Sequence, residues 1–576
     1  MSCSNIGARK NRNIRDHLFI INGIMNEVHK SKKRKIDIQI VDIKKCFDKM
    51  SYKETGNDLF NAGVRNDHFV LMANSNKKCQ VAVRTPWGSV TDRVELSEIE
   101  MQGTVPAPLK CSIQIDTLGK ECIESGECLY KYKECVDIPP LAMIDDILAV
   151  TDCSVESVKM NALIKSKVAH KSLELGPDKC FKMHVGQQDD CCPTLKIDDE
   201  VMLCSNKEKY LGDILTTDGR INQNIEERQN KGIGIVNTIS GILKEISFGP
   251  YYFEMAVLFR QSMLLNGILC NSEVLYGINK DHIEMLESVD RYFWRKIFQC
   301  PITTPSEIFY METSSTPVKF ILIKRRLMYY WNILQMTDAE LVKRVFNVQK
   351  ISPCKNDWVL QIEEDLRSCK IDENEEQIKK MKKYSFQKLV NRKIDDATRD
   401  YLLKIRDDPS RSKSKRIYPS DQMKDYLLSN DLTTEEKTLL FLMKSRMTDL
   451  KWNFKGKYQN NMNCSLCRLD FEESEIHLLQ CVELTCEPEL GEEMKMIKYE
   501  DIFGNLNEQI KAVKVWKKIF KMRRKKLEER KLSMGHQEHH QSASLRCSSQ
   551  QRVDLPHQNC DSSIYVQLLY QNDLGY

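Results

Sequence analysis

Residues 139–150, PPLAMIDDILAV, set two consecutive aspartates, Asp145 and Asp146, at the junction of two short apolar runs. The runs have the pattern of a buried hairpin, where charge is normally avoided. An unpaired carboxylate is costly to bury unless it binds a cation or takes up a proton. This doublet is therefore the strongest candidate for chemistry in the chain.

A third acid, Asp42, closes another apolar stretch. Residues 36–43, IDIQIVDI, alternate with period two and predict a strand that carries Ile36, Ile38, Ile40 and Asp42 on one face. A single strand-end acid is more often a cap or a turn residue. Two such sites in one sheet domain favour a divalent metal, because Mg²⁺ prefers oxygen ligands from carboxylates and substrate phosphates. Two ions about 4 Å apart could activate a hydroxyl and stabilise a leaving oxygen.

Two other acid doublets do not qualify. Asp189–Asp190 lies in the polar stretch GQQDDCCPT, and Asp198–Asp199 fills the middle of an expected hairpin turn. Both are interpreted as ordinary turn acids.

The segments around the acids predict an α+β domain with an antiparallel sheet. A helical stretch follows the first strand to about residue 75, and residues 80–96 have a hairpin pattern around Pro86–Gly88. Helices are expected at 108–122 and 155–175. The strands KCFKMHV, TLKID, EVMLC and KYLGDIL then end the sheet near residue 217.

From residue 221 to about 350 the pattern changes to successive helices. Aromatic and basic residues alternate in the last two of these helices, including Trp294, Arg325, Arg326 and Tyr329. Core aromatics beside cations with buried stems would give this pattern. A helix that faces nucleic acid would give it too, and the sequence leaves both interpretations open.

Composition sets outer bounds. The 576 residues are 41% apolar and 29% charged, which indicates a globular chain of several domains. No apolar run approaches the roughly 18 residues of a membrane span, and the start has no secretory signal. We therefore expect no membrane partner and an intracellular protein, whose 22 cysteines are reduced thiols or metal ligands.

The net charge of +5 is unevenly placed. Residues 1–35 hold nine Lys/Arg against two acids, and Lys521–Lys531 holds seven cations against two acids. Such runs are usually solvated helix faces or tails, and the alternative is contact with a phosphate backbone.

A cysteine-bearing module has the spacing Cys464-x₂-Cys467-x₉-His477-x₃-Cys481. Four ligands of these types at close spacing suit a closed, tetrahedral structural zinc. The alternative is four core residues without a metal. Cys486 is a nearby thiol with no assigned role.

The acid-bearing segments carry a family resemblance. VDIKKCFDKM (41–50) resembles the first catalytic motif of reverse transcriptases of non-LTR (LINE-type) retrotransposons. MQGTVPAPL (101–109) resembles their Gln-Gly-x-x-x-Ser-Pro motif, with Ala107 where Ser is usual, and AMIDDILAV (142–150) resembles their aromatic-Ala-Asp-Asp hairpin. LELGPDKC (173–180) and KYLGDILTTDGRINQNIEERQNKG (209–232) are similar to the segments that follow. The five segments stand in the family's order.

The resemblance implies roles for individual residues. Asp42 and Asp145 would hold two Mg²⁺ ions, with Asp146 assisting. Phe47 would select dNTPs by excluding a 2′-hydroxyl, and Gln102 and Gly103 would contact the nucleotide and template. Lys179 would lie near the leaving pyrophosphate as a possible general acid. Arg325 and Arg326 are the candidate nucleic-acid contacts.

It also implies the layout of a right-hand polymerase. The predicted parts are a basic remnant of the fingers (1–35), a palm (36–220), an all-α thumb (221–350), a charged helical connector (351–455) with a linker at 407–420, a zinc knuckle (456–490), a basic helix (491–534) and a disordered tail (535–576). Only 41 residues precede Asp42, so the resemblance implies truncated fingers.

The leading hypothesis is an RNA-directed DNA polymerase that uses an RNA template, a DNA primer or target and dNTPs, in nucleus and cytoplasm by family analogy. The alternative is an inactive remnant that binds RNA through thumb and knuckle. The intact acids favour the enzyme. The missing fingers favour the remnant, as do two departures from the family motifs, Ala107 in place of Ser and Met143–Ile144 in place of the aromatic–Ala pair. A telomerase- or maturase-like polymerase is disfavoured by the thumb and knuckle.

Overall fold

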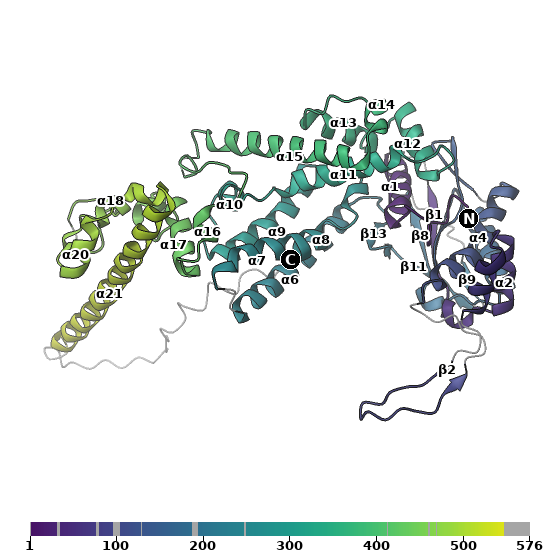
Figure 1. Ribbon diagram of the computed structural model, residues 1–576, viewed down its shortest axis with the longest axis horizontal. Coiled ribbons are helices and arrows are strands. Elements are labelled where there is room, and N and C mark those ends of the chain that lie inside the picture. Colours follow the sequence, from purple (N-terminus) through teal and green to yellow (C-terminus); the bar gives the residue numbers. More distant parts are fainter. Residues whose placement is uncertain are drawn as a thin grey trace, which may run out of the picture. The chain divides into compact units, whose positions relative to one another are not determined.

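The computed structural model describes residues 2–30, 35–75, 80–95, 104–127, 129–186, 194–197, 199–246, 249–411, 413–458, 461–467 and 469–545, with side chains through residue 532. The chain divides into two compact units, residues 1–447 and 448–576 (Figure 1).

The first unit is built on a five-stranded sheet with β1 at its centre. Its order is β11 (Leu203–Cys204), β8 (Phe181–Val185), β1 (Ile36–Asp42), β7 (Asp146–Thr151) and β6 (Leu141–Met143). Strand β1 pairs antiparallel with β7 and β8, and β6 pairs antiparallel with β7. The expected strand and acid hairpin are confirmed, while β11 adds a parallel edge to the predicted antiparallel sheet.

Helices cover both faces of this sheet. The alternation of β1 sends Ile36, Ile38 and Ile40 into one core cluster and Val41 into the other. The second cluster includes residues of α4 (Ala107–Ser125) and α5 (Ser154–His170). With both faces buried, the register of β1 is strongly specified.

The N-terminal segment is part of the first core cluster. Helix α1 (Ile14–Lys30) is buried along most of its length, although residues 1–35 are basic overall. The ring of Phe19 lies 5.2 to 5.9 Å from the rings of Tyr276, Tyr329 and Trp358. This helix therefore joins the sheet to residues more than 250 positions further along the chain.

Shorter elements complete the sheet region. These are η1 (Cys46–Lys49), α2 (Tyr52–Asn61), α3 (Asn66–Asn74), η2 (Pro177–Lys179), and the two-stranded pairs β2 (Gln80–Val81) with β3 (Val94–Glu95), β4 (Tyr130–Tyr132) with β5 (Val136–Ile138), β9 (Lys196–Ile197) with β10 (Glu200–Val201), and β12 (Lys207–Tyr210) with β13 (Asp213–Thr216). KYLGDIL is not the single strand we expected. It turns at Leu211 and Gly212, which both have positive φ.

The rest of the first unit is helical, as the sequence predicts. The helices are α6 (Asn222–Glu245), α7 (Tyr252–Phe259), α8 (Leu265–Ile268), α9 (Lys280–Phe298), α10 (Ser306–Thr313), α11 (Val318–Leu334), α12 (Leu341–Ile351), α13 (Trp358–Ser368), α14 (Glu375–Lys380), α15 (Lys383–Arg406), α16 (Asp425–Leu428) and α17 (Thr434–Lys444). Trp294 on α9 and Tyr329 on α11 are buried, so the core interpretation of these two aromatics is correct.

The second unit contains the cysteine module and a long helix. Its elements are η6 (Lys451–Phe454), α18 (Glu475–Leu478), α19 (Val482–Thr485), α20 (Pro488–Lys495), η7 (Tyr499–Phe503) and α21 (Leu506–Leu545). Helix α21 continues past residue 535, where we expected a disordered tail to begin. Residues 546–576 lie outside the described residues. Among the helices described here, none has both the length and the apolar character of a membrane span.

A buried ion pair between α11 and α13 gives a first prediction. Arg326 donates two hydrogen bonds of 2.6 and 2.7 Å to Asp365, and both side chains are almost fully buried. Asp365→Ala leaves the guanidinium charge buried without its partner, which should cost about 3 to 5 kcal/mol in urea unfolding. The neighbouring Glu364→Ala is the control. Glu364 pairs with Arg367 while both are mostly exposed, so the loss should stay below about 1 kcal/mol. Equal losses would contradict a structural role for the buried pair.

A second prediction concerns His17 on α1, which is almost fully buried. Its Nε2 lies 2.9 Å from the Ser4 carbonyl oxygen, so Nε2 carries the proton and donates it. Burial lowers the pKa of His17 to about 3. In the unfolded chain the histidine therefore takes up a proton as the pH falls through about 6.5, whereas in the folded chain it stays neutral down to about pH 3. The stabilising contribution of the neutral ring is full above pH 6.5 and is lost as the pH falls.

The urea midpoints of wild type and His17→Gln should accordingly converge as the pH is lowered from about 7 to about 5. Exposed His68 supplies the matched control, and the urea midpoint of His68→Gln should stay close to that of the wild type because surface substitutions change stability little. A constant gap between wild type and His17→Gln would rule out the titration of His17.

Candidate functional site

Three carboxylates gather at one end of the central sheet. Asp42 ends β1 and stands directly opposite Asp146, the first residue of β7. Asp145 lies in the two-residue turn between β6 and β7. The structure thus brings together the three acids that the sequence singled out, from segments about 100 residues apart.

The turn that carries Asp145 is strained. Ile144, the residue before it, has a φ of +61°. A β-branched residue is a true outlier in this left-handed region, and such strain clusters at functional sites. Two-residue hairpin loops take a positive φ at their first central residue, so the turn imposes this conformation, and the strain comes from Ile standing where Gly or Asn is usual.

Burial and neighbouring negative charge raise the pKa of two of these acids. Burial, and then the charges of Asp145 and Asp42, raise the pKa of Asp146 to about 6. Burial also raises the pKa of Asp145, and the charge of Asp42 adds to the effect. Like charges opposite each other in a sheet are destabilising. The site consequently has an excess of negative charge that a bound cation would relieve.

Lys179 is the cation beside these acids. Its Nζ lies 3.4 Å from Asp42 Oδ2, and its side chain is 66% exposed. The preceding loop is fixed by the end of β1, because the Gly176 N–H donates to the Asp42 carbonyl oxygen at 3.0 Å. The lysine charge lowers the pKa of both Asp145 and Asp146 and so offsets part of the effect of burial. The place of Lys179 near a leaving pyrophosphate stays a prediction.

Phe47 lies in η1, just after Asp42. Its ring is half-buried against the second core cluster, a position open both to a core role and to contact with a ligand. The adjacent Cys46 is buried, and its Sγ lies 2.9 Å from Cys111 Sγ on α4. Sequence reasoning missed this thiol pair, since nothing local links residues 65 positions apart. Gln102 and Gly103 lie outside the described residues.

The structure corrects the prediction for Arg326. This side chain is buried in the pair with Asp365 and is not available to a phosphate. Arg325 is part-buried. It donates to the Leu269 carbonyl oxygen at 2.5 Å and to Asn266 Oδ1 at 3.0 Å, and it lines a cavity of about 600 Å³.

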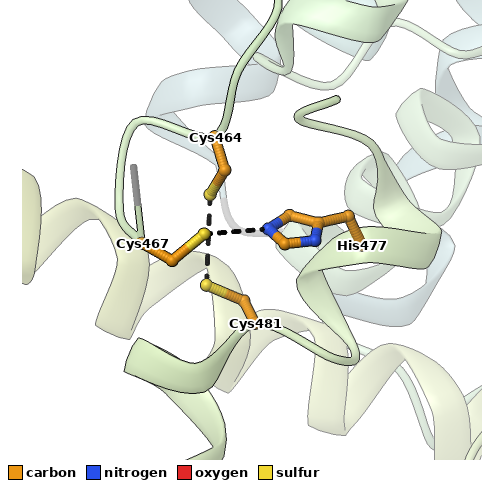
Figure 2. A group of neighbouring side chains, drawn as sticks. All are labelled: Cys464, Cys467, His477 and Cys481. Carbon is orange, nitrogen blue, oxygen red and sulfur yellow. Dashed lines mark hydrogen bonds between the residues drawn. The ribbon is translucent and has the colours of Figure 1, made fainter. Parts of the chain in front are cut away.

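The four cysteine and histidine side chains point toward one another (Figure 2). Their donor atoms all lie within 4.8 Å of one another. Cys464 Sγ lies 4.0 Å from Cys481 Sγ, and Cys467 Sγ lies 3.4 Å from His477 Nε2. Tetrahedral zinc with ordinary bond lengths requires about 3.8 Å between sulfurs and about 3.6 Å between sulfur and nitrogen. The arrangement therefore fits the ion.

Two arginines of α21 hold the loop between the first two cysteines. Arg530 donates to the carbonyl oxygens of Ser465, at 3.1 Å, and of Leu466. Arg523 donates twice to Glu473, a fully buried acid that also accepts from Ser465 Oγ. The sequence shows the four ligands but not these supports, which come from 50 to 65 positions further along the chain.

No protein-family model and no curated protein matches this chain. Among solved structures, it aligns with apo telomerase from Candida tropicalis at 11% identity and a TM-score of 0.31, over 65% of this chain and 56% of the other. Telomerase from Candida albicans with the TWJ fragment of telomeric RNA gives 13% identity and a TM-score of 0.30, over 61% and 53%. A C. tropicalis telomerase truncated from its C-terminal domain gives 12% and 0.26, over 36% and 38%.

The chain thus spans between 38% and 56% of the length of these three telomerases. Likeness at this level carries no argument about fold or function.

The cysteine and histidine geometry predicts one zinc per chain. Elemental analysis of the full-length protein should find it, and Cys467→Ser should lose it because a closed site needs all four ligands. Lowering the pH should release the metal, since the thiolates and the imidazole are then protonated. Exposed Cys486 provides the control, and Cys486→Ser should keep the zinc. Metal-free wild type, or equal loss in both variants, would reject the site.

Proposed function

We propose that this chain is an RNA-directed DNA polymerase of the LINE-type reverse transcriptase family. The observation that carries the proposal is the placement of Asp42 opposite Asp146, with Asp145 in the adjoining strained turn. Carboxylates at the ends of neighbouring strands are a suitable ligand set for divalent ions and the phosphates of a nucleotide. The order of the motif-bearing segments along the chain agrees with this family.

The mechanism assigns each side chain one task. Asp42 and Asp145 would hold two Mg²⁺ ions, and Asp146 would assist. When bound, such ions lower the pKa of an attacking 3′-hydroxyl and stabilise the oxygen that leaves. Lys179, close to Asp42 yet exposed, would neutralise or protonate the departing pyrophosphate. Phe47 would limit the space beside the sugar and so favour dNTPs.

The partners follow from this activity. An RNA template and a DNA primer or target would lie along the acid-bearing end of the sheet, by analogy with the family. The zinc held by Cys464, Cys467, His477 and Cys481 would be structural, because four protein ligands leave no open position.

A second candidate is an inactive remnant that binds RNA. Among the described residues, the cysteine and histidine donors form a close ligand group, whereas the three carboxylates do not. A chain with an intact knuckle and a defective acid site would show this contrast. Met143–Ile144 in place of an aromatic–Ala pair favours it as well.

Primer extension separates the two candidates. With RNA template, primer, dNTPs and Mg²⁺, the full-length chain should extend, and Asp145→Asn or Asp42→Asn should reduce extension by about 100-fold or more. The Asp145→Asn variant should still fold. The raised pKa of Asp145 means that its ionised form is disfavoured in the folded chain, and Asn is neutral. The control is Asp199→Asn in the turn doublet set aside above. Unchanged extension in the Asp145 variant would overturn the metal assignment, and RNA binding without extension by wild type would identify the remnant.

A further inference from the structure

Helix α21 carries an unusual concentration of positive charge. Residues 509–527 contain nine Lys/Arg and no acid. Like charges this dense repel one another along a helix unless something neutralises them. The question is which of the nine cations the protein uses for its own structure.

One face of the helix is committed to packing within the second unit. Ala512, Val513, Trp516 and Ile519 are buried on it. The cations near this face have acid partners, with Arg523 on Glu473 and Lys526 on Glu487 at 2.7 Å. On the flanks, Lys518 pairs with Glu493 at 2.5 Å. These contacts account for part of the charge by ordinary structure.

The opposite face keeps a row of cations that we call the lysine ridge, Lys511, Lys514, Lys521 and Arg524. All four side chains are exposed, and among the described residues none of them forms an ion pair. At about 100° per residue they fall within an arc of about 140°, and at 1.5 Å per residue they extend over about 20 Å. The ridge is therefore a straight, unneutralised strip of positive charge.

The chemistry of this face selects one kind of partner. A membrane-surface helix needs a free apolar face, but the apolar face of α21 is buried in its own unit. A protein interface relies on aromatic and aliphatic anchors, and the ridge itself offers only cations. A row of cations without such anchors suits a regularly spaced polyanion, and a nucleic-acid backbone is one.

We propose that the lysine ridge binds the phosphodiester backbone of single-stranded RNA. The inference rests on the proposed function, which supplies RNA as a partner, and it assigns the contact to residues that the family motifs do not include. Arg523 and Arg530 attach the helix to the cysteine and histidine loop of the same unit, so the ridge is presented as a rigid surface.

The test compares two full-length variants that each lose four exposed cations. The ridge variant is Lys511→Ala, Lys514→Ala, Lys521→Ala and Arg524→Ala. The matched control changes Lys382, Lys383, Lys388 and Lys404 to Ala, four exposed cations at or in α15 of the first unit. Affinity for fluorescent oligo(U) is measured by anisotropy over a range of salt, without dNTPs, and oligo(dT) of equal length tests whether DNA shares the site. Circular dichroism and zinc content check that both variants fold.

With a slope of about −0.7 per phosphate contact, the salt dependence of the ridge variant should be shallower by about 3, and that of the control unchanged. An unchanged slope in the ridge variant, or an equal change in both, would overturn the proposal. The proposal would also be overturned if the ridge variant kept its RNA affinity but lost binding to phosphatidylserine vesicles or to polyglutamate. If the wild type fails to extend a primer while the ridge still sets the slope, the polymerase assignment fails and this inference stands.

Discussion

The pairing of Asp42 with Asp146 across β1 and β7 is the constraint on which the acid-bearing end of the sheet depends. Two carboxylates directly opposed in a sheet repel, so a register that places them together is unfavourable by itself. The register is held by the residues behind them. Ile38 and Ile40 face one buried cluster and Val41 the other, and a slip of one residue would exchange the two faces. The burial of the apolar residues of β1 thus fixes the register that places Asp42 opposite Asp146.

Helix α1 makes that burial possible on one side. The sequence shows a basic end around an apolar stretch, and the charges dominate any composition-based interpretation. Its polar residues find partners far along the chain, as when Tyr329 donates to Asp16 at 2.9 Å. His17 is neutral in its buried position for the same reason, with Tyr210 and Ser4 as its partners. The local sequence pattern predicts the burial of this helix poorly, because the residues that cover it come from distant parts of the chain.

What could be predicted from the sequence is what is encoded locally. Period-two alternation predicts β1, and acids inside an apolar hairpin predict the doublet at the turn. Ligand spacing predicts the cysteine and histidine group. Side-chain pairs between distant residues could not be predicted. Nothing in the sequence near Arg326 indicates Asp365 as its partner, and nothing near Cys46 indicates Cys111. The adjacent Arg325 and Arg326 were equivalent in sequence, yet only Arg326 is fully committed to a buried pair.

The contrast between the compact zinc ligands and the open carboxylates has a chemical origin. Thiols and a neutral imidazole hydrogen-bond to one another, as Cys467 does with His477, so these ligands can gather before a metal arrives. Ionised carboxylates only repel, and the raised pKa of Asp146 records that repulsion together with burial. Such a group closes when a cation supplies the missing charge. An open set of acids is thus the expected ground state of a site that binds its ions with a phosphorylated substrate, and by itself it does not distinguish an enzyme from a remnant. The turn at Ile144 does not distinguish them either, because the Ile144 side chain packs against the second core cluster, and this packing offsets part of the cost of its positive φ.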